Sequence, residues 1–308
     1  MRFFVTGGAG FIGSNFVKHI LSVEDSSVEV TVFDSLTYAG SLENLPSPDQ
    51  EPRLKIIVGD VREISRLEDE MKGHDVVVHF AAESHVDRSI ESGQIFISTN
   101  VLGSFNVFQA SLNAKIQKVI HVSTDEVYGS LEYGSADEYS KLAPNSPYAA
   151  SKAASDLVAR SFVQTYGLDI RITRCCNNFG PNQNPEKLIP LLISKIKSGE
   201  NLPIYGDGSN IREWIHVDDH CRAICLVIAQ GEKGEIYNVG SGVEISNLDL
   251  ARMFLKFSIS KKSEIEFIAD RQGHDFRYSI DSTKIQRLGF LPKYSLDQEV
   301  GLALFLGN

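Results

Sequence analysis

Short apolar runs alternate with segments of helical spacing along the first half of the chain. The apolar runs lie at residues 2–6, 29–33, 54–58, 76–82 and 118–123. Between them, apolar residues recur at helical spacing in residues 11–22 and 99–113. Strands that are buried on both faces read as continuous apolar runs, and strands that alternate with helices form parallel sheets. The pattern predicts an α/β fold with a doubly wound parallel sheet, to which residues 169–175 add a sixth strand.

The pattern changes near residue 180. From there on, turns rich in glycine, proline and asparagine separate short strands, and residues 217–230 have helical spacing. We predict that residues 1–180 form the doubly wound domain. Residues 181–308 are expected to form mainly a smaller mixed α/β region, from which a strand or helix returns to the first domain. A cleft between the two, at the carboxyl ends of the parallel strands, is the expected ligand site.

Charge and composition exclude several functions. The 308 residues carry a formal net charge of −10 without a lysine or arginine run, so nucleic acid and anionic membranes are poor partners. We find no apolar run of membrane-spanning length and no secretory signal, and we expect a cytoplasmic protein. The four cysteines lack the spacing of a metal site, so we expect reduced thiols and no bound metal.

A glycine-rich turn follows the first predicted strand. Gly7, Gly10 and Gly13 lie three residues apart, a spacing that allows a tight turn, a close approach to a pyrophosphate, and close packing of helix on strand. Asp34 ends the second strand, where a carboxylate binds a ribose diol and repels a 2′-phosphate. Asp60 ends the third strand, within reach of an adenine, although a helix cap is an alternative role. The combination predicts a Rossmann-type site for NAD.

Tyr148 and Lys152 are four residues apart on a helix that Ser146 is expected to cap and Pro147 to begin. A phenol has a pKa of about 10 in water, so it needs a nearby positive charge to act as a base near neutral pH. We interpret Tyr148 as the base that takes a proton from a substrate hydroxyl while NAD accepts a hydride, with Lys152 and the nicotinamide supplying positive charge. The alternative, an unrelated tyrosine and a surface lysine, is disfavoured by the glycine motif.

Two acids directly follow the fifth predicted strand, in the order Thr124, Asp125, Glu126. Consecutive strand residues point to opposite faces, so both carboxyls can face one pocket only if the strand ends near Thr124 and the chain turns there. Two adjacent carboxyls away from water repel each other, so at least one pKa should rise, which suits one protonated and one ionised group. The alternative is a pair of solvated acids in a loop.

These motifs and several further stretches resemble the extended short-chain dehydrogenase/reductase family over nearly the whole chain. The stretches are TGGAGFIGS, FDSLTYAGSLENL, HFAAESHVDRSI, STDEVYG, SPYAASK, NNFGPNQNPEKLIP and RQGHDFRYSID. Within the family they are similar to the sugar-nucleotide 4,6-dehydratases. The resemblance implies loss of water from dTDP-glucose with tightly held NAD, in a homodimer formed through residues 94–113 and 147–166. The acid pair disfavours a 4-epimerase or a UDP-glucuronate decarboxylase. A UDP-glucose 4,6-dehydratase stays open, and a non-catalytic NAD-binding sensor is the alternative outside enzymes.

The resemblance also implies roles for individual residues. It makes Glu126 the base at C5 of the sugar and Asp125 the acid at the C6 hydroxyl, beside Thr124, Tyr148 and Lys152. The implied cofactor-binding residues are Gly7, Gly10, Phe11, Ile12, Gly13, Asp34, Ser35, Thr37, Asp60, Val61, Ala81, Ala82, Ser84, Thr99, Tyr148, Lys152 and Asn178. The implied substrate-binding residues are Ser84, His85, Asn177, Lys187, Leu188, Pro203, Tyr205, Arg212, Asn238, Arg271 and His274.

Overall fold

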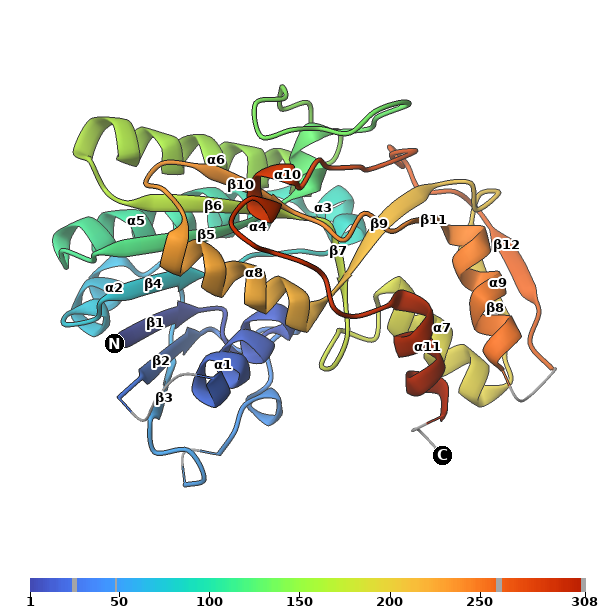
Figure 1. Ribbon diagram of the computed structural model, residues 1–308, viewed down its shortest axis with the longest axis horizontal. Coiled ribbons are helices and arrows are strands. Elements are labelled where there is room, and N and C mark those ends of the chain that lie inside the picture. The colour runs from blue at the N-terminus through green and yellow to red at the C-terminus, as the bar shows by residue number, and fades with distance from the viewer. Residues whose placement is uncertain (24–26, 48, 259–261, 306–308) are drawn as a thin grey trace.

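A seven-stranded parallel sheet forms the centre of the molecule (Figure 1). The computed structural model describes residues 1–23, 27–47, 49–258 and 262–305. The strands of the sheet are β1 (Arg2–Thr6), β2 (Glu29–Asp34), β3 (Leu54–Val58), β4 (Val76–His79), β5 (Lys118–Thr124), β6 (Ile170–Cys175) and β10 (Ile236–Val239). Their order is β10-β6-β5-β4-β1-β2-β3, so the winding reverses between β1 and β4. Ligands bind at such a reversal in doubly wound sheets. The predicted fold class is confirmed.

Helices cover both faces of this sheet. One face carries α1 (Phe11–Val23) and α8 (Val217–Gln230). The other carries α2 (Ile64–Met71), α5 (Ser104–Asn113) and α6 (Pro147–Tyr166). Because neighbouring strand residues point to opposite faces, Val5 packs in the layer with α1, whereas Phe4 packs in the layer with α5. Burial on both faces explains why these strands read as unbroken apolar runs.

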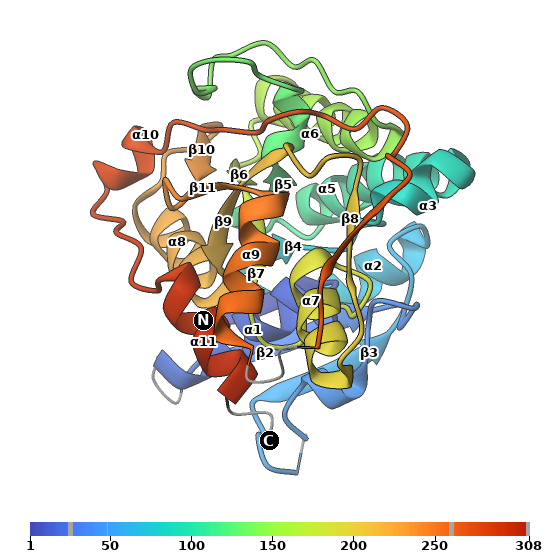
Figure 2. The same ribbon diagram turned by 90° about the vertical axis from the view of Figure 1, so that its right-hand side faces the viewer.

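A smaller lobe lies at the carboxyl ends of the strands (Figure 2). Its strands are β7 (Asn177–Phe179), β8 (Leu202–Tyr205), β9 (Ile211–His216), β11 (Glu244–Ser246) and β12 (Ile265–Ile268). Its helices are α7 (Leu188–Ser198), α9 (Asn247–Phe257) and α11 (Leu296–Phe305). Leu192, Trp214, Leu250 and Phe254 form part of its separate apolar core. Although α8 and β10 belong to the second half of the chain, both pack in or on the large sheet, so the two halves interpenetrate.

The remaining elements are short. They are η1 (Leu42–Asn44), α3 (Val86–Glu91), α4 (Gly93–Phe96), the π-helical turn η2 (Ile97–Gly103), η3 (Asp125–Tyr128) and α10 (Thr283–Gln286). The fourth predicted strand ends three residues early, at His79, because residues 80–82 leave the sheet and line a cleft. Cys175, Cys176 and Cys221 are buried free thiols. Within the described ranges, no helix is long and apolar enough to cross a membrane, and no cluster of three metal-binding side chains occurs.

Candidate active site

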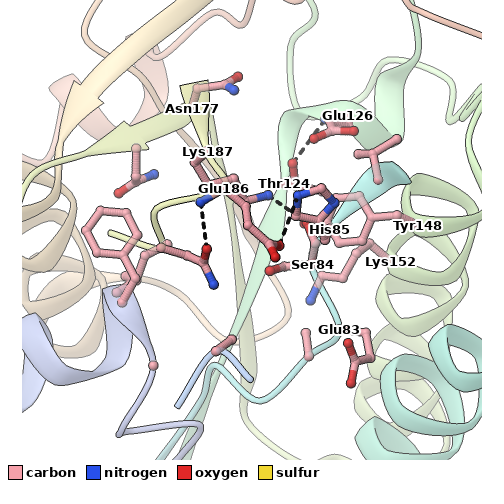
Figure 3. Close-up of a pocket in the computed structure, with 18 of the residues that line it drawn as sticks. Glu83, Ser84, His85, Thr124, Glu126, Tyr148, Lys152, Asn177, Glu186 and Lys187 are labelled. Carbon is pink, nitrogen blue, oxygen red and sulfur yellow. Dashed lines mark hydrogen bonds and ion pairs between the residues drawn. The ribbon is translucent and has the colours of Figure 1, made fainter. Parts of the chain in front are cut away.

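A cleft of about 520 Å³ opens between the sheet and the smaller lobe, and residues from both halves of the chain line it. All candidate catalytic and cofactor-binding residues line this cleft. So do all candidate substrate-binding residues except Asn238. Figure 3 shows Tyr148 and Lys152 on one side of the cleft, and Asn177 and Lys187 on the other. The structure therefore brings together groups that lie far apart in the sequence.

The glycine turn leaves no room for a side chain at Gly7 or Gly13. Gly7 adopts a φ of +69°, and a Cβ there would lie 2.5 Å from the backbone nitrogen of Ala81. A Cβ on Gly13 would overlap the carbonyl oxygen of Gly7, so α1 packs this closely on the turn because position 13 is a glycine. The first turn of α1 contains no acid, and its backbone N–H groups favour an anion. The turn thus fits a dinucleotide pyrophosphate.

Asp34 ends β2 beside the glycine turn. Its carboxylate accepts hydrogen bonds from the backbone N–H groups of Ala9 (2.9 Å) and Leu36 (2.8 Å), and burial raises its pKa. These bonds fix the carboxylate where the ribose diol of NAD is expected. Asp60 also lines the cleft, but Arg62 lies 2.5 Å from its carboxylate and lowers its pKa through that hydrogen-bonded pair. Contact between Asp60 and adenine stays a prediction.

The two adjacent acids both reach the cleft because β5 stops before them. Thr124 is the last residue of β5, and the short turn η3 starts at Asp125. The Thr124 hydroxyl accepts a hydrogen bond from the Glu126 N–H (3.3 Å) and caps the turn, which ends at Gly129 with a φ of +77°. The expectation that the strand ends at Thr124 is confirmed. Outside the strand, the alternation of side chains no longer separates Asp125 from Glu126, and both line the cleft.

Asp125 and Glu126 have different surroundings. Asp125 is 3% exposed, and one of its oxygens accepts a hydrogen bond from the Thr124 hydroxyl at 3.2 Å. Burial, followed by the nearby charges of Glu126 and Glu213, raises the pKa of Asp125 well above its usual value. Burial also raises the pKa of Glu126, but Lys187 is the first of several cations that oppose this rise. Of the two acids, Asp125 is therefore the one that holds its proton more strongly, and Glu126 is the one that ionises first.

Helix α6 begins at the cleft and carries Tyr148 and Lys152 into it. Ser146 caps the helix by accepting a hydrogen bond from the Ala149 N–H (3.0 Å), and Pro147 is the first helical residue. Burial lowers the pKa of Lys152 to about 8.

The pKa of Tyr148 is raised well above 10. Burial has the largest effect, Glu126 and Cys175 add to it, and a hydrogen bond with Thr124 opposes it. The surrounding side chains therefore keep the phenol protonated. Tyr148 needs additional positive charge in the cleft before it can act as a base near neutral pH.

Cations gather on the opposite wall. Lys187, which immediately precedes α7, donates a hydrogen bond from Nζ to the carbonyl oxygen of Ser84 at 3.0 Å (Figure 3). Arg271 pairs with Asp87 at 2.6 Å, and the buried Arg212 also lines the cleft. Three cations around one cleft form a local basic site in an acidic protein, and such a site fits a diphosphate.

The other candidate substrate residues surround these cations. Tyr205 packs edge to face against His274, with ring centroids 6.2 Å apart, and Leu188 and Pro203 add apolar surface. An apolar and aromatic wall of this kind fits a nucleobase. His85 lies 3.5 Å from the carboxylate of Glu186 at the cleft wall. Asn177 lines the cleft, and the side-chain oxygen of its neighbour Asn178 lies 2.9 Å from His220 Nδ1.

Asn238 lies apart from the other candidate substrate-binding residues. It is fully buried on β10, at the edge of the sheet, and does not line the cleft. Its side-chain oxygen accepts a hydrogen bond from the Tyr128 hydroxyl (2.7 Å), and its side-chain nitrogen donates to the carbonyl oxygens of Ala136 (2.9 Å) and Asp281 (3.2 Å). These bonds use the amide to hold loops against the sheet, which is a structural role; contact between Asn238 and substrate stays a prediction.

Several residues of the cleft were missed by the sequence analysis. They are Glu83, Asp87, Cys175, Gln183, Glu186, Trp214 and Tyr278. Asp87, Glu186 and Tyr278 lie inside the stretches that carry the family resemblance, so reading every position of those stretches could have found them. Trp214 lies on β9 in a part of the chain without a recognisable motif, and its place in the cleft depends on the tertiary structure.

Comparisons with known proteins agree with this geometry. The family model described as GDP-mannose 4,6 dehydratase matches residues 4–301. The low-salt glycan biosynthesis protein Agl12 of Haloferax volcanii is 48% identical, over 100% of this chain and 99% of that protein. The dTDP-glucose 4,6-dehydratase of Streptomyces niveus is 48% identical, over 95% of this chain and 88% of that protein. Among solved structures, the protein is similar to the crystal structure of DesIV, a dTDP-glucose 4,6-dehydratase of Streptomyces venezuelae with NAD bound. The two sequences are 52% identical, and the match covers 99% of this chain and 96% of the DesIV chain with a TM-score of 0.94. The chain therefore belongs to the GDP-mannose 4,6-dehydratase family.

Proposed function

We propose that this protein is an NAD-dependent 4,6-dehydratase that converts dTDP-glucose to dTDP-4-keto-6-deoxyglucose and water. The observation that carries the proposal is the convergence of Thr124, Asp125, Glu126, Tyr148 and Lys152 on one cleft. Oxidation at C4 alone calls for a base such as Tyr148, whereas loss of water also needs a base at C5 and an acid at C6. The dTDP-glucose 4,6-dehydratases that are 48% and 52% identical support dTDP-glucose as the substrate.

Bound NAD would supply the redox chemistry of the reaction, as acceptor of the hydride from C4 of the sugar and as its donor to C6. Gly7, Gly10 and Gly13 would hold its pyrophosphate, and Asp34 would hold its adenosine ribose. The fixed carboxylate of Asp34 and the absence of room for a side chain at Gly7 and Gly13 support this assignment.

The side chains of the protein account for the proton transfers. Tyr148 accepts the proton of the C4 hydroxyl. Once C4 is a ketone, the C5 proton is acidic, and Glu126 removes it; Glu126 then returns a proton to C5 when the hydride reaches C6. Asp125 gives its proton to the C6 hydroxyl, which leaves as water. The pKa difference within the pair supports this division, because an acid must start protonated and a base must start ionised.

Incubation of the purified protein with dTDP-glucose tests the proposal. The expected product has the mass of the 4-keto-6-deoxy sugar nucleotide, and a panel that varies only the nucleotide separates dTDP-glucose from UDP-glucose. A C4 epimer as sole product, or no turnover with any nucleotide glucose, would contradict the proposal.

Two variants test the roles of individual groups. Tyr148→Phe is expected to lose oxidation and dehydration together, because both follow proton removal at C4. Glu126→Gln is expected to oxidise C4, seen as NADH absorbance in a single turnover, and to stop before water is lost. Full dehydratase activity in either variant would contradict the role of the residue that was changed.

We also propose that the protein is a homodimer and that it acts in the cytoplasm. Four large apolar side chains, those of Ile97, Leu102, Phe105 and Leu157, are exposed on η2, α5 and α6, which pack against one another. We call them the apolar patch, and such patches are typical of protein interfaces. The free thiols support a reducing compartment.

A further inference from the structure

Helix α6 carries a buried acid, Asp156, in addition to Tyr148 and Lys152. Asp156 follows Lys152 by one helical turn and Tyr148 by two, on the buried face of the helix. It is 2% exposed. A carboxylate so far from water costs free energy unless other groups compensate its charge. The partners of Asp156 therefore indicate what this position does.

Groups on the sheet hold the Asp156 carboxylate. Arg174, on β6, donates a hydrogen bond from Nε to one carboxylate oxygen at 2.9 Å. The other oxygen lies 3.3 Å from His121 Nε2, and within the described residues no donor makes a well-aligned hydrogen bond to it. Burial raises the pKa of Asp156, but His121 and Arg174 outweigh it and hold the pKa below its usual value. Burial also lowers the pKa of His121 to about 4, so His121 is neutral near pH 7. Asp156 thus keeps its negative charge inside the protein.

Lys152 is the catalytic group that this charge affects. Its Nζ donates a hydrogen bond to the Val122 carbonyl oxygen at 2.8 Å, and the residue is 4% exposed. Among the residues that the structure describes, no acid forms an ion pair with it. Burial lowers its pKa to about 8, and Asp156 is the first group that opposes this. The titratable groups with an electrostatic effect on Lys152, or affected by it, are Asp156 on α6, His79 on β4, His121 on β5 and Cys175 on β6.

We propose that Asp156 is a positioning residue of the active site that acts through Lys152: its carboxylate, held by Arg174, keeps the Lys152 ammonium charged and in place beside Tyr148. The inference rests on the proposed function, because that function gives Lys152 its part in the reaction. Apolar side chains of similar volume often replace a buried ion pair without loss of stability. Stability alone therefore does not explain the buried Asp156–Arg174 pair. Its place one helical turn from Lys152 favours a role of Asp156 in the active site.

Asp156→Asn tests the proposal because it removes the charge and keeps the shape. Loss of a nearby negative charge makes each neighbouring proton leave more easily, so the pKa values of Tyr148 and Lys152 both fall. Both the acid and the alkaline limb of the pH profile of kcat are expected to move to lower pH by about one unit. Asp156→Glu keeps the charge and is expected to restore the profile. As a matched control, Asp169→Asn breaks the ion pair with Arg171 at 2.9 Å, which does not line the cleft, and is expected to leave the profile unchanged.

Competitive acetylation of Lys152 over a range of pH, read by mass spectrometry, gives a measurement that needs no substrate. Lys152 is expected to titrate about one unit lower in Asp156→Asn than in the unmodified protein. A wrong substrate assignment would leave this shift intact. Unchanged titration in folded Asp156→Asn would overturn the proposal. If that variant does not fold, Asp156→Asn combined with Arg174→Met leaves no unpaired buried charge. A downward shift is still expected, because Asp156 is the first group that raises the pKa of Lys152 and Arg174 is not among the groups that shift it.

Discussion

Asp125 and Glu126 have nearly the same chemistry, and their neighbours make them different. Burial and then the nearby acids outweigh the effect of Arg212 on Asp125, so its pKa rises well above the usual value. Lys187, Arg212 and Arg271 face Glu126 and favour its charged form. The sequence predicts that one of two adjacent acids takes up a proton. Which one does so depends on cations contributed by other parts of the chain, and the sequence pattern does not place these.

Asp125→Asn tests this division, because an amide occupies the same space and has no acidic proton to give. The variant is expected to oxidise C4 and to exchange the C5 proton with deuterated solvent, while elimination of water slows by about 10²- to 10⁴-fold. Deuterium uptake and product formation are both followed by mass spectrometry. Glu126→Gln is the matched comparison and is expected to lose the exchange itself. Normal elimination in Asp125→Asn together with lost C5 exchange would reverse the two roles.

At the scale of elements, the sequence predicts long buried segments better than short ones. The predicted strands at residues 2–6 and 54–58 have the bounds of β1 and β3, and the helical spacing at 217–230 matches α8. These segments are long enough to show a clear apolar pattern. By contrast, β7 and β11 have three residues each, too few to show a period of two. Their pairing with β9 depends on contacts between distant parts of the chain.

The glycine turn allows a prediction that separates folding from cofactor binding. A Cβ on Gly10 would lie 3.3 Å from the Gly7 carbonyl oxygen, so Gly10→Ala is expected to fold with a loss of stability under about 1 kcal/mol. The added methyl group would occupy the place of the pyrophosphate, and NAD affinity is expected to fall at least about tenfold. Gly13→Ala is the contrasting variant, because its Cβ would overlap the backbone of the turn. It is expected to lower the melting temperature strongly.

Calorimetric titration with NAD and thermal unfolding measure these two effects separately. Unchanged NAD affinity in a well-folded Gly10→Ala would show that the turn does not hold the cofactor. A melting temperature of Gly13→Ala equal to that of the unmodified protein would contradict the packing argument.

At the scale of the whole molecule, ion pairs join the two lobes across the mouth of the cleft. Asp87 pairs with Arg271 at 2.6 Å, and Arg88 pairs with Glu186 at 2.7 Å. The family resemblance pointed to Arg271 as a substrate ligand but not to its partner. Asn238 shows the converse, because a position within a matching motif is used for structure. Local patterns predict elements and motifs, whereas contacts between lobes depend on how the elements assemble.

The apolar patch allows a prediction about assembly. A stable dimer buries about 1,600 Å² in total, and its centre is depleted in charged residues. Leu102 and Phe105 are 52% and 41% exposed on neighbouring turns of η2 and α5. Replacing both by glutamate would place two carboxylates at the interface, where desolvation is costly. Light scattering is expected to give the mass of two chains for the unmodified protein and of one chain for Leu102→Glu/Phe105→Glu.

Leu291→Glu is the matched control for this measurement. Leu291 is 67% exposed and lies outside the apolar patch, so the same change of charge there is expected to leave the dimer intact. Dissociation in the control as well would point to a general effect of charge, and a dimeric Leu102→Glu/Phe105→Glu would exclude the patch as the interface. If the patch is the interface, α6 serves two purposes, because its buried face carries Tyr148, Lys152 and Asp156 and its outer face meets the second chain. Dissociation is then expected to lower kcat as well, through the loss of support for α6.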